Sequence, residues 1–258
     1  MTKRNRLNAQ SVAIISRPDL RLDWCSHNAA KYAVEHWHYS KSLPTPPLVK
    51  IGVWESCRFI GCVLFSRGSN NNGLKPFSLD ATEGCELTRI ALDVHQSPVT
   101  RIASIGIKLM RQSNPGLRLI LSYADPNKGH NGAIYQAGGW IYSGQTSPDI
   151  EYIDPNGRHW HSRQVSRTGV SRQYGEYRPV PKFSDCQPIR LDGKHRYLYP
   201  LDKAMEAQIA PLAQPYPKRP KDSSEPPATH AGEGGAAPTR TLQNLFPLRD
   251  RMARLVSD

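Results

Sequence analysis

Residues 119–142 constrain the fold of this chain more than any other segment. The segment begins with an aliphatic run at 119–121, typical of a buried strand, and this run ends abruptly in the polar turn 122–125. After a Pro/Gly turn we predict a short helix from about Asn131, ended by a Gly-Gly pair, and a second strand from Trp140. A strand, polar turn, helix and strand in this order favour an open α/β sheet, which binds ligands at its strand ends.

Apolar periodicity and turn residues predict the other elements. Ser97 and Pro98 supply an N-cap and a first-turn proline for the richest helix, which ends at 114–116. The remaining predictions are strands at 11–16, 49–54, 58–66 and 85–93, a helix at 28–38, and a hairpin from 151 to 165 around the turn 154–157. This order predicts an α/β (α+β) class in which a mixed sheet carries helices on both faces.

The length of 258 residues suits one domain with appendages. We predict a single domain at 1–209, which includes an Arg-rich hairpin and loop at 149–180. Residues 210–258 are rich in Pro, Ala, Gly, Ser and charge, and we expect them to be disordered. No apolar run approaches the ~20 residues of a membrane span. The basic N-terminus lacks the apolar core of a signal peptide, so we expect a cytoplasmic protein with no membrane partner.

The formal charge of +12 favours a polyanionic partner. A merely solvated basic surface is the alternative, and a membrane surface is disfavoured because no amphipathic, Trp-edged helix is evident. The five cysteines are an odd number with no C-x-x-C pair, which argues against a disulfide framework and against a zinc finger. We expect reduced, mostly buried thiols.

Two motifs carry a family resemblance. D-P-x-x-G-H-x-G-x-I-Y-Q-A-x-G-W at 125–140 and H-Y-S-K-S-L-P at 38–44 resemble signatures of the Mom family of Mu-like bacteriophages, and the resemblance covers roughly residues 28–177. It implies an acetyltransferase-like (GNAT) fold with two splayed central strands that admit an acyl donor. It also implies conversion of adenine in phage DNA to a carbamoylmethylated form in the host cytoplasm, which protects that DNA from restriction.

The GNAT resemblance implies a site for the acyl donor. Arg101, Ser104 and Gly106 approximate the pyrophosphate motif R/Q-x-x-G-x-G/A, although Ser104 replaces the first glycine. A helix N-terminus binds phosphate through free N–H groups and the positive end of its dipole. An ordinary amphipathic helix with a surface arginine is the alternative. Asn131 and Tyr135 occupy the second donor-binding helix, where Tyr135 either protonates the leaving group or packs against Trp140.

Asp125 is the predicted catalytic base. The exocyclic amine of adenine is barely basic because its lone pair is delocalised, so acylation requires an acceptor for the departing proton. Ser122 or Tyr39 would orient the base, and Asp149 is a further catalytic candidate. The alternative for Asp125 is structural, since Asp-Pro commonly begins a turn.

An arginine-rich segment is the predicted DNA surface, because arginine clamps phosphates and neighbouring aromatics can fill the gap left by a flipped base. An exposed charged face is the alternative. His159 and His161 would share one strand face, yet we predict no metal site, with iron or zinc left open. The predicted phosphate contacts are Arg158, Arg163, Arg167 and Arg172, with Arg178 and Tyr177 nearby.

The predicted partners are double-stranded DNA with a flipped adenine and an acyl donor. This donor is either acetyl-CoA, which requires a separate nitrogen source and oxidant, or a glycyl donor such as glycyl-tRNA. A homodimer is compatible with the sequence. Two other functions stay open: an N-acetyltransferase acting on RNA, protein or a small amine, and a non-catalytic DNA-binding protein.

Overall fold

The computed structural model describes residues 19–68, 72–173 and 175–218. The predicted strand at 11–16 and most of the predicted tail lie outside these residues. Within them, the main sheet has the order β1-β2-β3-β4-β5-β12-β6. Every neighbouring pair is antiparallel except β4 and β5, which are parallel. The strands are β1 (Leu20–Trp24), β2 (Leu48–Glu55), β3 (Arg58–Ser66), β4 (Gly84–Leu92), β5 (Leu119–Ala124), β6 (Ile141–Gln145) and β12 (His195–Pro200).

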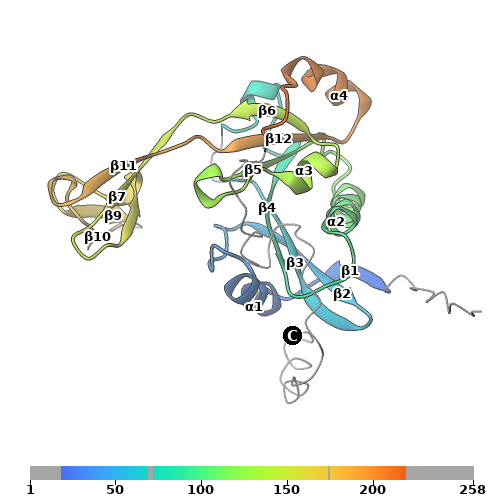
Figure 1. The fold of residues 1–258 in the computed structure, drawn as a ribbon, viewed down its shortest axis with the longest axis horizontal. Helices are drawn as coiled ribbons and strands as arrows, with labels where there is room; N and C mark the ends of the chain where they lie inside the picture. Colours follow the sequence, from blue (N-terminus) through green and yellow to red (C-terminus); the bar gives the residue numbers. More distant parts are fainter. Residues whose placement is uncertain (1–18, 69–71, 174, 219–258) are drawn as a thin grey trace, which may run out of the picture.

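Helices cover both faces of this sheet (Figure 1). Successive side chains of its strands point to opposite faces, and both faces carry apolar residues that must be buried. On one face, α1 (His27–Trp37) packs on alternate residues of β3, and α4 (Lys203–Ile209) packs on alternate residues of β5. The opposite face packs against α2 (Val99–Ser113) and carries the residues of α3 (Ala133–Ala137). The mixed α/β class predicted from the sequence is confirmed.

The two central strands part soon after they meet. Parallel pairing of β4 with β5 is limited to Gly84–Leu119, Cys85–Ile120 and Glu86–Leu121. Beyond these pairs, β4 continues along β3 and β5 continues along β12. The Ser122 hydroxyl donates to the carbonyl of Leu87 at 2.8 Å at this point. The parting is the feature that the GNAT resemblance predicted.

Residues 146–194, between β6 and β12, form an arm that extends away from the main sheet (Figure 1). Its three-stranded sheet has the order β11-β7-β8, and β9 pairs with β10. The predicted hairpin is present, but its second strand ends at His161 rather than Val165, because His161 caps a 3-10 turn at Ser162–Gln164. The arm strands are β7 (Asp149–Ile153), β8 (His159–His161), β9 (Val170–Gln173), β10 (Glu176–Pro179) and β11 (Gln187–Leu191).

Two predicted boundaries need correction. The α2 helix begins at Val99 with Pro98 as its cap, since the N–H of Ser97 donates to Glu55 and its hydroxyl has no partner among the described residues. Residues 210–218 are not a separate tail. Gln214 N donates to the carbonyl of Tyr142 at 2.8 Å, and the Tyr216 hydroxyl donates to the carbonyl of Trp140 at 2.7 Å, so this segment lies along β6.

Within the described ranges, no helix has both the length and the apolar character needed to cross a membrane. All five cysteines are free thiols. Cys62, Cys85 and Cys186 are buried, whereas Cys57 is exposed. Burial raises the pKa of Cys85 to about 12, and the pKa of Cys25 to about 11 against the opposing effect of Lys50.

Candidate functional site

The segment after α1 is anchored by a buried histidine. The α1 helix starts where Ser26 Oγ accepts the N–H of Ala29, and it ends at Trp37. His38 follows with only 4% of its surface exposed, and its Nδ1 accepts the N–H of Ser40 at 3.1 Å. Burial, with Arg89 and other cations nearby, lowers the pKa of His38 to about 3. His38 is therefore a neutral structural acceptor at pH 7.

A β-bulge in β4 brings Arg89 to this segment. Leu64 of β3 pairs with Arg89 and Phe65 pairs with Leu87, which leaves Thr88 without a pairing partner on β3. Bulges redirect the side chains that follow them and are frequent beside active sites. Arg89 Nε donates to Ser40 Oγ at 3.1 Å, and its Nη1 donates to the carbonyl of Thr88 at 2.7 Å. Through this bulge, the Arg89 side chain of β4 binds the segment that follows α1.

The loop after β5 meets the same segment. Asp125 caps a 3-10 turn at Pro126–Lys128, and its Oδ1 accepts the N–H of Asn127 at 2.9 Å and the side-chain amide of Asn127 at 3.0 Å. The backbone carbonyl of Asp125 accepts the N–H of His130 at 3.1 Å. The His130 ring then lies 4.9 Å from the ring of Tyr39, centroid to centroid. The two sequence motifs are therefore in contact.

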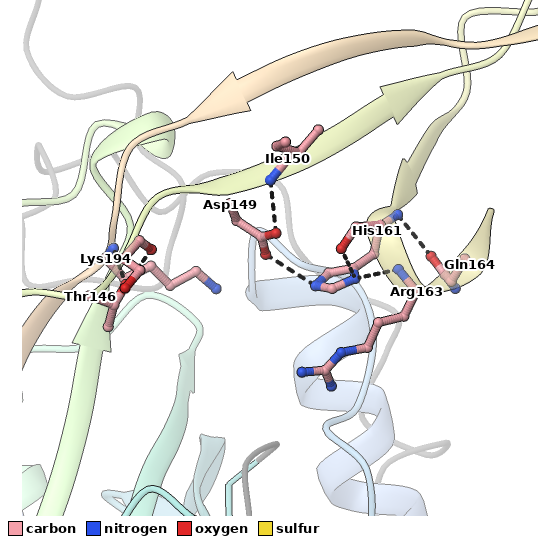
Figure 2. Close-up of polar contacts among 9 residues, drawn as sticks. Thr146, Asp149, Ile150, His161, Arg163, Gln164 and Lys194 are labelled. Atoms are coloured by element: carbon pink, nitrogen blue, oxygen red, sulfur yellow. Dashed lines mark hydrogen bonds and ion pairs between the residues drawn. The ribbon is translucent and has the colours of Figure 1, made fainter. Parts of the chain in front are cut away.

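Asp125 therefore caps a turn, as the structural alternative predicted, and its catalytic role stays a prediction. Ser122 is fully buried and its hydroxyl is committed to Leu87, so we find no sign that it orients Asp125. Asp149 lies in the arm, where its Oδ2 is 3.1 Å from His161 Nε2 (Figure 2). Among the described residues, the Asp149 carboxylate contacts Ile150 N and His161 Nε2, which both lie in the arm, and it makes no contact with Asp125.

The loop before α2 is held by an acidic side chain, and donor binding by a pyrophosphate cradle of Arg101, Ser104 and Gly106 stays a prediction. The N–H groups of Gln96 and Ser97 both donate to the carboxylate of Glu55 at 2.8 Å. Although burial acts in the opposite direction, these hydrogen bonds lower the pKa of Glu55. The carboxylate of Glu55 therefore accepts from the two N–H groups that precede Pro98 and α2.

The residues expected to line that cradle have other contacts. Arg101 is exposed in the first turn of α2, and the Ser104 hydroxyl donates to the carbonyl of Thr100 at 2.8 Å. Gly106 is buried two turns into the helix, where a methyl group in place of its hydrogen would lie 3.6 Å from Val63 Cγ1. A methyl group therefore fits at Gly106 without displacing β3.

Asn131 and Tyr135 lie against an aromatic cluster. The carbonyl of Asn131 accepts from the Tyr197 hydroxyl and from Gln136 Nε2. Tyr135 is 6% exposed, with its ring 5.1 Å from that of Trp140 and 5.2 Å from that of Tyr197. Tyr135 therefore packs against Trp140, which was the alternative prediction for this residue. The role of Tyr135 as a proton donor stays a prediction.

The arm exposes the predicted DNA contacts. Arg158 stacks over Trp160 at 4.1 Å from the ring centroid, and Trp160 Nε1 donates to Asp154 Oδ2 at 2.8 Å. Tyr177 is 75% exposed, with Arg172 5.9 Å from its ring centroid. Arg163, Arg167 and Arg178 are exposed as well.

The arm histidines pair with acids. His159 Nδ1 lies 3.0 Å from Glu151 Oε2, and His161 Nε2 lies 3.1 Å from Asp149 Oδ2. The Nδ1 of His161 accepts the N–H of Arg163, which leaves the other ring nitrogen to face the carboxylate (Figure 2). In the part of the chain that is described, no three His, Cys, Asp or Glu side chains gather in a way that could hold a metal ion.

Comparison with known proteins identifies the family. The model of the Mom protein family matches residues 19–218. The chain belongs to this family. The methylcarbamoylase mom of Escherichia phage Mu is 23% identical over 207 residues, a match that covers 78% of this chain and 84% of the phage Mu protein. The Mom resemblance seen in the sequence is therefore confirmed.

Two solved acetyltransferase structures are among the structural matches. A putative acetyltransferase from Acinetobacter baylyi is 11% identical, with a TM-score of 0.41, over 73% of this chain and 96% of that one. The spermidine N-acetyltransferase of Vibrio cholerae, solved with CoA and spermine, is 11% identical, with a TM-score of 0.36, over 70% of this chain and 95% of that one.

Sequence reasoning missed several polar residues of this Mom family site. Strict alternation would place Glu86 and Arg89 on opposite faces of β4, because they are three residues apart, and the bulge at Thr88 that brings them to one face has no local signal. Asn127 lies inside the family motif at a variable position, yet its side chain hydrogen-bonds the backbone of Asp192 on the returning end of the arm.

Proposed function

We propose that this protein modifies DNA by converting adenine to N6-carbamoylmethyladenine, beginning with acyl transfer to the exocyclic amine. One observation carries the proposal: the two Mom-family motifs meet, through Tyr39 and His130, next to the end of β5, where the sheet has opened. The name of the phage Mu relative supports a carbamoylmethyl-type product. Protection of phage DNA in the host cytoplasm would follow from it.

Asp125 is the proposed base. Asn127 holds its Oδ1, while its Oδ2 has no partner among the described residues, so one oxygen fixes the side chain and the other is available as an acceptor. The adenine amine attacks the carbonyl carbon of an activated acyl ester or thioester. The new C–N bond forms, the bond to the leaving oxygen or sulfur breaks, the amine proton passes to Asp125, and the leaving group takes up a proton.

The donor is proposed to be a glycyl ester, as in glycyl-tRNA. Glycyl transfer places a free amine beside the purine. This amine attacks the adjacent ring carbon through a five-membered spiro intermediate, and collapse expels the original nitrogen as a carboxamide. All atoms are conserved and no oxidant is required, whereas acetyl-CoA would need an oxidant and a nitrogen source.

The arm is proposed to hold double-stranded DNA. The four predicted phosphate contacts lie on the arm, and Tyr177 offers an exposed ring that can fill the space of an extruded base. These contacts would raise affinity without reading sequence. The proposed phosphate contacts are Arg158, Arg163, Arg167 and Arg172.

Mass spectrometry of nucleosides from cells that express the chain tests this function. We expect a carbamoylmethyl mass increment on deoxyadenosine, its loss with Asp125→Ala and Asp125→Asn, and DNA affinity within about twofold of wild type. Asp125→Asn keeps an oxygen for the Asn127 hydrogen bonds, so it separates catalysis from turn capping. Asp80→Ala is the matched control in an exposed turn.

Three outcomes would contradict parts of the proposal. Unmodified adenine with the wild-type chain overturns the function and favours the non-catalytic DNA-binding alternative, or an acetyltransferase if RNA, protein or small amines are acetylated instead. Full modification by Asp125→Asn overturns the catalytic assignment. With ¹⁵N in the exocyclic amine of adenine, an unlabelled product amide overturns the glycyl rearrangement.

A further inference from the structure

Glu86 occupies the last paired position before β4 and β5 separate. It pairs with Leu121 in the final parallel pair between β4 and β5, and with Ser66 of β3. Its side chain therefore points to the face that carries α1, the same face on which the bulge places Arg89. Glu86 is part of no motif and has no role in the function proposed above.

The carboxylate of Glu86 is left without a partner. Among the described residues it makes neither a hydrogen bond nor an ion pair, although it is only partly exposed. Arg89, the nearest cation along β4, is directed instead to Ser40 and to the carbonyl of Thr88. An unpaired, partly desolvated carboxylate lowers the stability of a fold, and such a cost is typical of groups retained for function.

The surroundings of Glu86 show what it can bind. Burial raises its pKa, while Arg89 and Lys194 lower it. Lys194 comes from the base of the arm, where its backbone N–H donates to Thr146 Oγ1 (Figure 2). Tyr123 lies two residues along β5 from Leu121, the pairing partner of Glu86, so its side chain projects from the same face of the sheet. Burial, and to a smaller extent Glu86, raises the pKa of the Tyr123 hydroxyl. A bare acceptor is thus flanked by donors from β4, β5 and the arm.

We propose that Glu86 is the base-reading residue of the site and accepts a hydrogen bond from the exocyclic amine of an extruded adenine. This inference rests on the proposed function and gives it a recognition element. Adenine presents an amino donor beside ring-nitrogen acceptors. Glu86 matches the donor, and the Tyr123 hydroxyl or the Lys194 ammonium matches an acceptor. Enzymes that flip a base read it through such edge contacts.

Binding to synthetic duplexes tests the inference without any acyl donor. The target position holds either adenine or unsubstituted purine, which lacks only the exocyclic amine, and it faces an abasic site so that base pairing does not differ. A good edge contact discriminates by about tenfold or more. We expect wild-type protein to bind the adenine duplex at least about tenfold more tightly than the purine duplex.

Two substitutions isolate the carboxylate. Glu86→Met removes the acceptor at nearly constant volume, and we expect it to abolish the preference while raising the melting temperature, because an unpaired, partly desolvated charge is lost. Glu86→Gln keeps one acceptor oxygen and should retain part of the preference. Glu83→Gln is the matched control, since it removes the same charge just before β4, where Glu83 faces Arg118.

Equal affinity of the wild type for the two duplexes overturns the inference. So does an unchanged preference in Glu86→Met, provided that the variant is folded as judged by its melting curve. These results leave the proposed function standing if nucleoside analysis finds modified adenine. Conversely, unmodified adenine in cells together with a Glu86-dependent preference for adenine overturns the function and supports a base-reading protein.

Discussion

Replacing Gly106 by alanine tests whether the close approach of α2 to β3 is needed for donor binding or can be filled to stabilise the fold. Gly106 lies in the helix interior, where glycine costs ~1 kcal/mol relative to alanine. The added methyl would sit 3.6 Å from Val63 Cγ1 and 3.9 Å from Leu22 Cδ2, which is ordinary contact distance. Burial of a methyl contributes up to ~0.8 kcal/mol. We therefore expect Gly106→Ala to raise the free energy of unfolding by about 1–2 kcal/mol.

Thermal and urea unfolding measure this effect. For a domain of this size, 1–2 kcal/mol corresponds to a rise of ~2–8 °C in melting temperature. Gly52→Ala is the matched control, because its methyl would lie 2.5 Å from Trp54 Cη2 and 2.9 Å from Cys25 Cβ. Overpacking of this kind costs ~1–3 kcal/mol, so the same substitution should destabilise at Gly52.

The Gly106 variant also tests the donor site. If Gly106 has no part in donor binding, the variant modifies DNA at the wild-type rate. A stable Gly106→Ala protein that loses modification would refute this reasoning, because it would mean that the small residue admits the donor's phosphates. Destabilisation of the variant would show that α2 does not pack on β3 as described.

Three further predictions concern pH, the loop and the arm. Because the pKa of His38 falls from 6.5 to about 3 on folding, the unfolded chain takes up the extra proton between these pH values, and lowering the pH from 7 to 5 should cost ~2 kcal/mol of stability. His38→Gln should lose that part of the pH dependence in unfolding titrations. Asn127→Ala should lower the modification rate at least tenfold while DNA affinity stays within about twofold, because it removes one of the two hydrogen bonds to Asp125 Oδ1 and disconnects the loop from the arm. Arg163→Ala should reduce the salt dependence of DNA affinity by about one unit in a log–log plot, since one phosphate contact is lost.

Each of these predictions has a control and a contrary result. Equal acid destabilisation of His38→Gln and wild type would show that His38 is not the buried neutral group. For the loop, Asn156→Ala is an exposed turn control, and parallel loss of DNA affinity would indicate a folding defect. For the arm, Lys31→Ala on the exposed side of α1 should leave the salt slope unchanged, and an equal effect of both variants would point to net charge rather than to the arm.

Local pattern predicted most of the main sheet. The strands β2, β3 and β4 and the helices α1 and α2 follow apolar periodicities that their own burial enforces. The strand β12 was missed because its six residues follow the arm and pair with β5, whose residues lie more than seventy positions earlier. Pairing across such a separation is a tertiary choice that no local pattern encodes.

In the candidate site too, some features follow from local sequence and others depend on tertiary contacts. The proximity of Tyr39 to the loop of Asp125 was predicted, since Tyr39 was a candidate for orienting Asp125, but the ring contact with His130 was not. The role of Glu55 at the start of α2 was hidden, since this acid reaches the helix from the β2–β3 turn. The alignment of Glu86 with Arg89 depends on one unpaired residue in β4, and a single such residue inverts the alternation that sequence reasoning relies on.

The placement of β12 between β5 and β6 has a consequence for biosynthesis. The strand β6 leaves the ribosome early but has no neighbour in the sheet until the whole arm and then β12 have been made. During that interval β5 and β6 each present an open backbone edge, which is the kind of surface that invites association between nascent chains. Both edges are covered only when β12 inserts between β5 and β6, so the time taken to synthesise the arm sets how long the incomplete sheet is exposed.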